Sequence, residues 1–167
     1  MTTESNIILN TVQVNQKIKR IAYQIYESNS NEQEVIIAGI IGNGFIFAEK
    51  LVTALKEIST LEVTICKVDI NKKKPLEPVS TSLEVKAYEN KSLVLVDDVL
   101  NSGTTLIYGV KHFLEVPLKR FKSAVLVNRN HKKYPVKADF KGISLSTSIK
   151  EHIQIDFIGN ETKAYLV

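Results

Sequence analysis

The stretch Leu93-Val94-Leu95-Val96-Asp97-Asp98-Val99-Leu100-Asn101-Ser102-Gly103-Thr104-Thr105-Leu106 decides the fold. An apolar run ends in two adjacent carboxylates, and a turn of small polar residues leads directly into a helical pattern. Carboxylates at the carboxyl end of a strand suit a metal ion or a sugar diol. A small-residue turn that opens a helix suits phosphate, because its N–H groups point outward and the helix dipole favours an anion. The segment therefore predicts a site for a Mg²⁺-bound sugar phosphate.

A simpler interpretation of the same stretch is a buried strand whose Asp98 caps the next helix. Asp is common near helix starts, so its position alone does not separate the two interpretations. Capping leaves Asp97 and the Ser-Gly-Thr-Thr turn at residues 102–105 without a role. We therefore favour a ligand site.

The whole chain has the size and composition of one globular domain. Its 167 residues are 44% hydrophobic and 24% charged, which is ordinary for a globular protein and enough to bury a core. We expect a single domain over residues 1–167. The net charge of +4 fits an anionic substrate or a nucleic acid.

The expected location is the cytoplasm. Cys66 is the single cysteine, so no internal disulfide can form, which agrees with a reducing compartment. Residues 1–6 lack the layout of a signal peptide, and no apolar run has the length that spans a bilayer. We expect no association with membranes.

Helical and strand patterns alternate along the chain. Helices are predicted for residues 10–26, for the stretch that carries Ala48, Leu51, Val52 and Leu55, and for the stretch that carries Leu106, Val110 and Phe113. Strands are predicted for Val35–Ile41, Leu61–Ile65, Leu93–Val96, Phe121–Val127, and around Ile143/Leu145 and Ile153/Ile155/Phe157. This alternation predicts an α/β fold with a mostly parallel sheet flanked by helices.

Local signals place the turns. Asn10 and Gln13 have the spacing of a capping box at the start of the first helix. The turns at residues 42–44 and 101–105 both follow strand ends, so they should lie at the same edge of the sheet.

Residues 71–90 are the longest stretch without a clear periodicity. They contain two prolines, the lysine run 72–74 and few large apolar side chains. This composition indicates a long loop or irregular hairpin, with residues 83–87 as its one alternating piece. The lysine run is most simply a solvated surface, although a role toward a substrate stays open.

The central stretch resembles the phosphoribosyl pyrophosphate (PRPP) signature of type I phosphoribosyltransferases, which is four apolar residues, two acids, two apolar residues, one variable residue and then Thr/Ser-Gly. Residues 124–131, 134–140 and 146–148 resemble the tail of the PyrR family, which are bifunctional pyrimidine-operon attenuators with uracil phosphoribosyltransferase activity. The spacing also matches at the first helix, residues 38–40 and residues 48–51. The resemblance implies the type I phosphoribosyltransferase fold, with a small hood from the terminal segments.

The resemblance also implies the chemistry. A nucleobase nitrogen attacks C1′ of Mg²⁺-bound PRPP, and pyrophosphate leaves through an oxocarbenium-like transition state. The acidic pair matches the residues that handle the ribose hydroxyls and that lie close to the Mg²⁺: Asp97 and Asp98. The turn matches the loop that holds the 5′-phosphate: Asn101, Ser102, Gly103, Thr104 and Thr105.

Other matches surround this centre. The pyrophosphate loop corresponds to Gly42, Asn43 and Gly44, with Lys67 as a basic residue that meets the pyrophosphate. Asn128 and Arg129 match positions at the base and the hood, and residues 71–90 match the flap that closes over the site.

Several positions depart from the PyrR pattern. Gly42-Asn43-Gly44 stands where these proteins usually carry Thr-Arg-Gly, and the missing Arg removes a contact worth ~1.5–3 kcal/mol. The segment Lys67-Val68-Asp69 replaces a more strongly charged Arg-Asp-Asp, and Asn128 replaces an Asp. Weak or altered catalysis is therefore one of the open alternatives.

Three functions follow as hypotheses. The first is transfer of phosphoribose to a pyrimidine, with uracil as the expected base and a homodimer or higher homo-oligomer as the expected assembly. The second is a nucleotide-sensing regulator that binds RNA through basic residues on a dimer face: Lys19, Arg20, His131, Lys132 and Lys137. The third is a transferase for another base, or a relative that binds nucleotide without turnover.

Asn101 narrows the choice of base. Transferases for 6-oxopurines resemble this chain around the acidic pair but carry an Asp at this position, near the base. An amide cannot act as a general base near neutral pH, and loss of such proton transfer costs roughly 10²–10⁴-fold in rate. The residue therefore predicts inefficient use of hypoxanthine and guanine.

Overall fold

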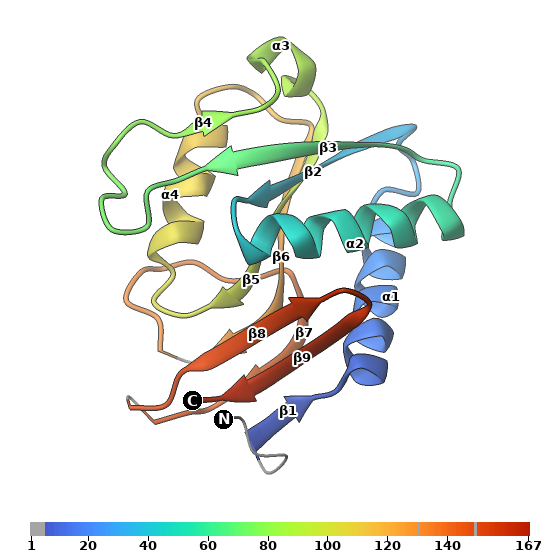
Figure 1. The fold of residues 1–167 in the computed structure, drawn as a ribbon. Helices are drawn as coiled ribbons and strands as arrows, with labels where there is room; N and C mark the ends of the chain where they lie inside the picture. The colour runs from blue at the N-terminus through green and yellow to red at the C-terminus, as the bar shows by residue number, and fades with distance from the viewer. Residues whose placement is uncertain (1–5, 130, 149) are drawn as a thin grey trace.

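The larger of two sheets carries the predicted site residues (Figure 1). The computed structural model describes residues 6–129, 131–148 and 150–167. In this part of the chain, strands lie side by side in the order β4 (Ser80–Thr81), β3 (Glu62–Asp69), β2 (Glu34–Ile40), β5 (Ser92–Leu100), β6 (Arg120–Arg129) and β7 (Phe140–Leu145). Neighbouring strands are parallel except at the edge, where β4 runs antiparallel to β3. The predicted mostly parallel sheet is confirmed.

Helices cover both faces of this sheet. The helices α1 (Thr11–Ser28) and α2 (Asn43–Ile58) pack with one set of buried strand residues, including Val35 and Ile37. The residues that alternate with these along β2, Ile36 and Ala38, belong to the core cluster that also holds Leu106 and Phe113 of α4 (Thr104–Phe113). Because the central strands are buried on both faces, their middle residues are apolar at successive rather than alternate positions, as in Leu93–Val96 and Ala124–Val127.

The start of α1 agrees with its predicted capping box. Asn10 Oδ1 accepts a hydrogen bond from the Gln13 N–H at 2.9 Å, and Gln13 Oε1 accepts one from the Asn10 N–H at 3.0 Å. These bonds satisfy two backbone donors that a helix start leaves unpaired. The helix continues to Ser28, two residues beyond the predicted end.

The ends of the chain form the second sheet. Strands β1 (Ile7–Leu9), β9 (Glu161–Leu166) and β8 (Ile153–Ile158) pair antiparallel in the order β1-β9-β8. Figure 1 draws these three strands side by side at the bottom of the view. The predicted hood from the terminal segments is confirmed, although neither β1 nor β9 was predicted as a strand.

The segment 71–90 is more ordered than predicted. Its alternating piece is not extended, because Val85–Tyr88 form the short helix α3, which follows β4. The helical turn brings the Tyr88 ring to 5.2 Å from that of Phe113, edge to face, and buries it. The exposed loop is therefore confined to the region before β4, around residues 71–78.

In the described part of the chain, no helix combines the length and apolar character needed to cross a membrane.

Candidate functional site

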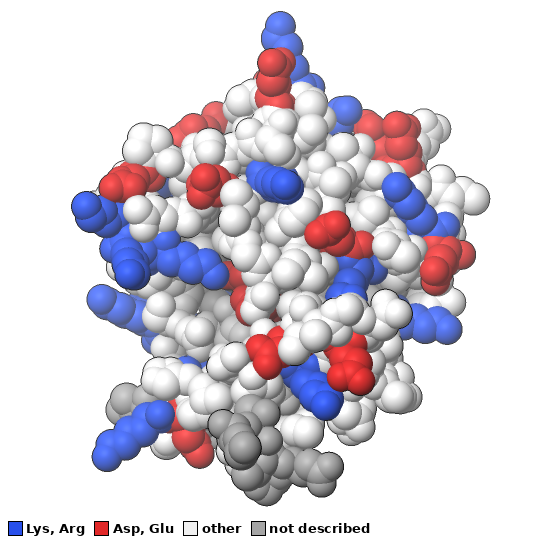
Figure 2. Space-filling model, viewed as in Figure 1, with Lys and Arg blue, Asp and Glu red and all other residues white. Residues whose placement is uncertain are grey.

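A cavity of about 270 Å³ opens at the carboxyl end of β5. The end of β5, the small-residue turn and the start of α4 line this cavity together. The lining residues are Asp97, Asp98, Val99, Leu100, Asn101, Ser102, Gly103, Thr104, Thr105 and Leu106, and Lys72, Val125 and Ile153 complete the wall. The structure thus brings the seven residues predicted from the central stretch into one wall. Figure 2 shows blue basic side chains gathered on the left of this face, over the loop that Figure 1 draws between β3 and β4.

The two carboxylates differ in their surroundings. Asp97 is buried and its Oδ1 accepts a hydrogen bond from the Asp98 N–H at 2.9 Å, whereas Asp98 is half-buried. Burial raises the pKa of Asp97 to about 8, the neighbouring Asp98 adds to the rise, and Lys72 opposes it. Two carboxylates this close favour a bound cation or hydroxyl donors that share their charge.

Asp97 packs against Gly44, at a position that a larger side chain would fill. A Cβ at this position would lie 2.8 Å from Asp97 Oδ1, 3.1 Å from its Cα and 3.2 Å from the Val96 oxygen. The first turn of α2 therefore approaches the carboxylate closely, with its unpaired N–H groups at the same edge.

The small-residue turn is held in shape from two sides. Gly103 caps α4 with a φ of 86°, a left-handed conformation that glycine adopts without strain. The Ser102 and Thr104 hydroxyls lie 2.8 Å apart. The Lys133 and Tyr134 N–H groups both donate to the Ser102 oxygen, at 2.7 and 3.1 Å. The Thr104 N–H donates a long bond to Ser102 Oγ at 3.3 Å. The next N–H groups at the start of α4 point toward the place where a phosphate site holds its anion.

The residues predicted to bind pyrophosphate do not line the cavity, although Gly44 packs against Asp97, which does. Gly42, with a φ of 101°, ends the turn after β2, and α2 already begins at Asn43, so the predicted loop of residues 42–44 is largely a helix start. Lys67 is exposed near the end of β3, with its Nζ 4.9 Å from the centre of the Phe45 ring. Asn43 turns away to the hood, where its Nδ2 donates to the Ile155 oxygen at 2.9 Å.

Asn128 and Arg129 lie behind the cavity rather than on its described wall. Asn128 Nδ2 donates to Ser144 Oγ at 3.3 Å, and among the described residues its buried Oδ1 has no hydrogen-bond partner. Arg129 is buried and reaches from the turn to the segment before β8. Its Nη1 donates to Asn101 Oδ1 at 3.0 Å, and its Nε donates to Thr147 Oγ1 at 2.8 Å.

Lys72 is a site residue that the sequence pattern assigned to a solvated loop. Its charge opposes the raised pKa of Asp97, so the lysine run is not uniformly directed to solvent. A lysine run carries no periodicity that distinguishes one member from the next, so only the path of the loop after β3 shows which lysine faces the carboxylates.

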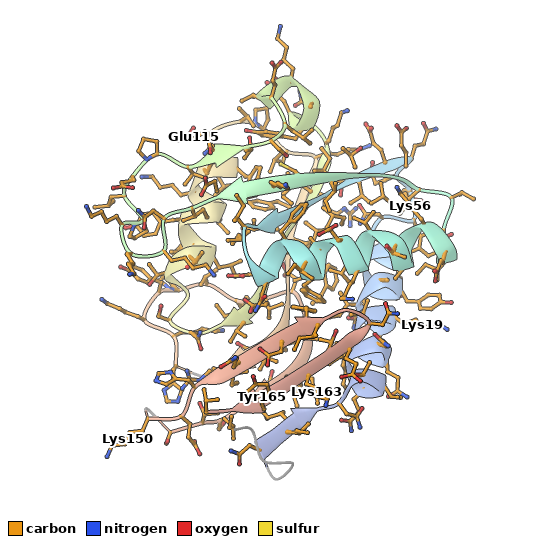
Figure 3. The ribbon with its side chains drawn as sticks, viewed as in Figure 1. Lys19, Lys56, Glu115, Lys150, Lys163 and Tyr165 are labelled. Atoms are coloured by element: carbon orange, nitrogen blue, oxygen red, sulfur yellow. The ribbon has the colours of Figure 1, made fainter. Side chains whose placement is uncertain are left out.

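The five residues predicted for RNA binding lie on two sides of the chain. Lys19 lies on α1, at the right of Figure 3, whereas the loop 131–137 is bonded to Ser102 next to α4, at the left. Arg20 donates to the carbonyl oxygens of Lys141 and Gly142, at 2.9 and 2.6 Å, and a His131 ring nitrogen meets the Thr147 oxygen. One chain thus presents Lys132 and Lys137 together but not the full set, and RNA binding stays a prediction.

Comparison with known proteins agrees with this geometry. Residues 4–157 match the model of the phosphoribosyl transferase domain. A bifunctional protein PyrR from Geobacter sulfurreducens is 33% identical over 162 residues, which cover 92% of each chain. One from Macrococcus caseolyticus is 28% identical over 172 residues, which cover 98% of this chain and 99% of the relative.

Solved structures share the fold. A hypoxanthine-guanine phosphoribosyltransferase from Bacillus anthracis superimposes with a TM-score of 0.76 at 20% identity, covering 96% of this chain and 97% of that one. A hypoxanthine phosphoribosyltransferase of Trypanosoma cruzi gives a TM-score of 0.78 at 15% identity, covering 96% and 95%. At these identities the likeness establishes the architecture alone.

Proposed function

The chain belongs to the phosphoribosyl transferase family and is similar to PyrR proteins, and on that basis we propose that it transfers phosphoribose from PRPP to uracil, forming UMP and pyrophosphate. One observation carries the proposal. The acidic pair, with Asp97 buried and Asp98 half-buried, lines a single cavity together with the turn at residues 101–105, at the carboxyl end of β5. A ribose 5-phosphate that places its phosphate on the turn has its hydroxyls within the same short wall as Asp97 and Asp98.

The turn supplies the binding energy for the phosphate end. The first N–H groups of α4 and the hydroxyls of Ser102, Thr104 and Thr105 are the donors, and the dipole of α4 adds a favourable field. Because the turn is fixed by Gly103 and by the bonds to the Ser102 oxygen, it is organised before the ligand arrives. Holding the phosphate in a fixed turn fixes the position of C1′.

The carboxylates act on the ribose. Asp98, half-buried beside Asp97, accepts hydrogen bonds from the ribose hydroxyls as positive charge develops at C1′. Oxygen donors of this kind suit Mg²⁺, which prefers one or two carboxylates together with phosphate oxygens. When bound, Mg²⁺ neutralises the pyrophosphate that leaves.

The groups at the other end of the reaction are the N–H donors at the start of α2 and the lysines 67 and 72. The lysines supply positive charge where the bond from C1′ to the pyrophosphate oxygen breaks. The new bond forms between C1′ and N1 of uracil, and the proton on N1 leaves to solvent. Uracil N–H is acidic enough that Asn101 need not act as a base.

Pyrophosphate release from Mg²⁺-PRPP tests the proposal, with uracil, hypoxanthine, guanine and xanthine as separate acceptors. We expect release with uracil, and Asp98→Asn should lower kcat/KM by roughly a hundredfold or more. Glu57→Gln is the matched control, because it removes an exposed carboxylate at the far end of α2. No release with any base, or a purine used as well as uracil, would overturn the proposal.

A further inference from the structure

Arg129 fixes which end of the Asn101 amide faces the cavity. Arginine has N–H donors and no acceptor, whereas an asparagine amide has an oxygen acceptor at one end and an NH₂ donor at the other. Arg129 Nη1 lies 3.0 Å from Asn101 Oδ1. A flipped amide would place NH₂ against the guanidinium, donor against donor. The orientation therefore follows from the chemistry of the pair and not from the assignment of the two amide atoms.

The guanidinium is itself unable to turn away. Besides its bonds to Asn101 and to Thr147 Oγ1, its Nη2 donates to the carbonyl oxygens of Ser148 and Glu151, at 3.2 and 2.6 Å. Arg129 is 5% exposed. Four acceptors on two separate segments hold the planar guanidinium in one orientation, so the Asn101 oxygen stays bonded to Arg129.

The other end of the amide is free. Asn101 is exposed and lines the cavity beside the acidic pair, and no described residue accepts a hydrogen bond from its Nδ2. At this point the wall offers a donor. An aspartate in the same place would offer only acceptor oxygens when ionised.

We propose that Asn101 Nδ2 selects the base by donating a hydrogen bond to a carbonyl oxygen beside the ring nitrogen that attacks C1′. In uracil this oxygen is O2. If a base presents an N–H at the same place, two donors face each other. Neither this N–H nor the Asn101 NH₂ group then has a hydrogen-bond acceptor. The inference deepens the proposed function and rests on it, and it assigns Asn101 as the residue that determines specificity, with Arg129 as its positioning residue.

The test compares UMP with 2-thio-UMP, in which sulfur, a weak acceptor, replaces O2. Titration calorimetry gives the ratio of the two affinities for the wild type, Asn101→Ala and Asn101→Asp. One neutral hydrogen bond predicts that the wild type prefers UMP by roughly three- to tenfold. The ratio should fall to about one in Asn101→Ala and Asn101→Asp, because neither keeps the donor. Asn10→Ala, which removes a cap on α1, should keep the wild-type ratio.

The ratio separates the possible failures. A variant that disturbs the turn weakens both nucleotides equally and leaves the ratio readable. If Asn101→Ala keeps the wild-type preference while UMP binds, the donor role is wrong and the proposed function stands. If the wild type binds neither nucleotide, both proposals fall.

Nuclear magnetic resonance of the side-chain amides gives an independent readout. The Asn101 resonance is identified by its disappearance in Asn101→Asp. We expect UMP to shift it and ribose 5-phosphate to leave it in place. A shift with ribose 5-phosphate alone would show that the amide serves the phosphate, and would overturn the assignment to the base.

Discussion

The central sheet and the hood are held by different forces. Strands β2, β5 and β6 are buried on both faces, and their apolar side chains contact α1 and α2 on one side and α4 on the other. The hood has few buried apolar residues, among them Leu9, Ile155 and Ala164, and its Ile158 is 71% exposed. The β5 side of the cavity thus rests on more apolar packing than the hood side, although Leu9, Ile155 and Ala164 do join the core that α1 and α2 cover.

Directional polar bonds supplement the smaller amount of apolar packing at the hood. Arg129 joins the turn to residues 147–151, Asn43 joins α2 to β8, and Thr11 Oγ1 bonds the Thr162 oxygen at 3.1 Å. A neutral hydrogen bond contributes ~0.5–1.5 kcal/mol, and one from a charged donor ~1.5–3 kcal/mol. A few such bonds are enough to place the hood but not to make it as resistant to opening as the sheet. The comparison teaches that the hood is the side of the cavity that opens more easily.

Removing Arg129 should give the largest change in how easily the hood opens compared with the central sheet. Arg129→Met deletes four hydrogen bonds, so we expect local opening of the hood to become easier by roughly 2–4 kcal/mol. Hydrogen exchange should then be about a hundredfold faster for the amides of β8 and β9 and little changed for those of β5 and β6.

Arg20→Met is the matched control for this experiment. The Arg20 guanidinium also donates to two carbonyl oxygens, but it is exposed and both acceptors lie on β7. Its loss should cost less than ~1 kcal/mol and leave hood exchange unchanged. Equal acceleration of sheet and hood amides in Arg129→Met would mean that the two regions open as one unit.

The same contrast explains what the sequence could predict. Continuous apolar strands, the acidic pair and the turn at residues 101–105 are local signals, and each one lies where it was expected. The capping box of Asn10 and Gln13 is equally local. All of these follow from neighbouring residues and the alternation of elements, and tertiary contacts did not have to be known.

The features that the sequence failed to predict depend on contacts with residues far away in the chain. The alternating piece at residues 83–87 became the helix α3 because Tyr88 packs against Phe113, which no local pattern shows. The hood strands β1 and β9 are short and pair across the whole length of the chain. The bond from Arg129 to Asn101 and the place of Lys72 at the acidic pair are side-chain contacts of the same kind.

The second largest effect that we expect is a pH dependence of the free energy of unfolding, which Asp97 should cause. Its carboxyl ordinarily titrates at 3.8, and burial raises the pKa to about 8 in the folded chain. Between these values the folded state holds a proton that the unfolded state releases. The free energy of unfolding therefore falls as pH rises toward 8, by at most ~1.4 kcal/mol per pH unit.

Urea unfolding at a series of pH values measures how the free energy of unfolding changes with pH. We expect the wild type to lose about 2 kcal/mol between pH 6 and pH 8, and Asp97→Asn to lose much less. Asp69→Asn, which removes an exposed carboxylate from β3, should keep the wild-type slope. A wild-type slope retained by Asp97→Asn would show that another group controls the pH dependence.

Removing the Asn43 side chain should give the smallest change in the free energy of hood opening. It tests most directly how the hood is attached to α2. Asn43→Ala removes one neutral hydrogen bond to the Ile155 oxygen, so hood opening should become easier by ~1 kcal/mol, a three- to tenfold gain in exchange for β8. Gln154→Ala is the control, because its bond to Asp156 lies within the hood and does not reach the sheet. Combined with Arg129→Met, the effect of Asn43→Ala should add if the two attachments act independently, since they join the hood to different elements. A combined effect no larger than that of Arg129→Met alone would instead mean that releasing the segment 147–151 already frees β8 from α2.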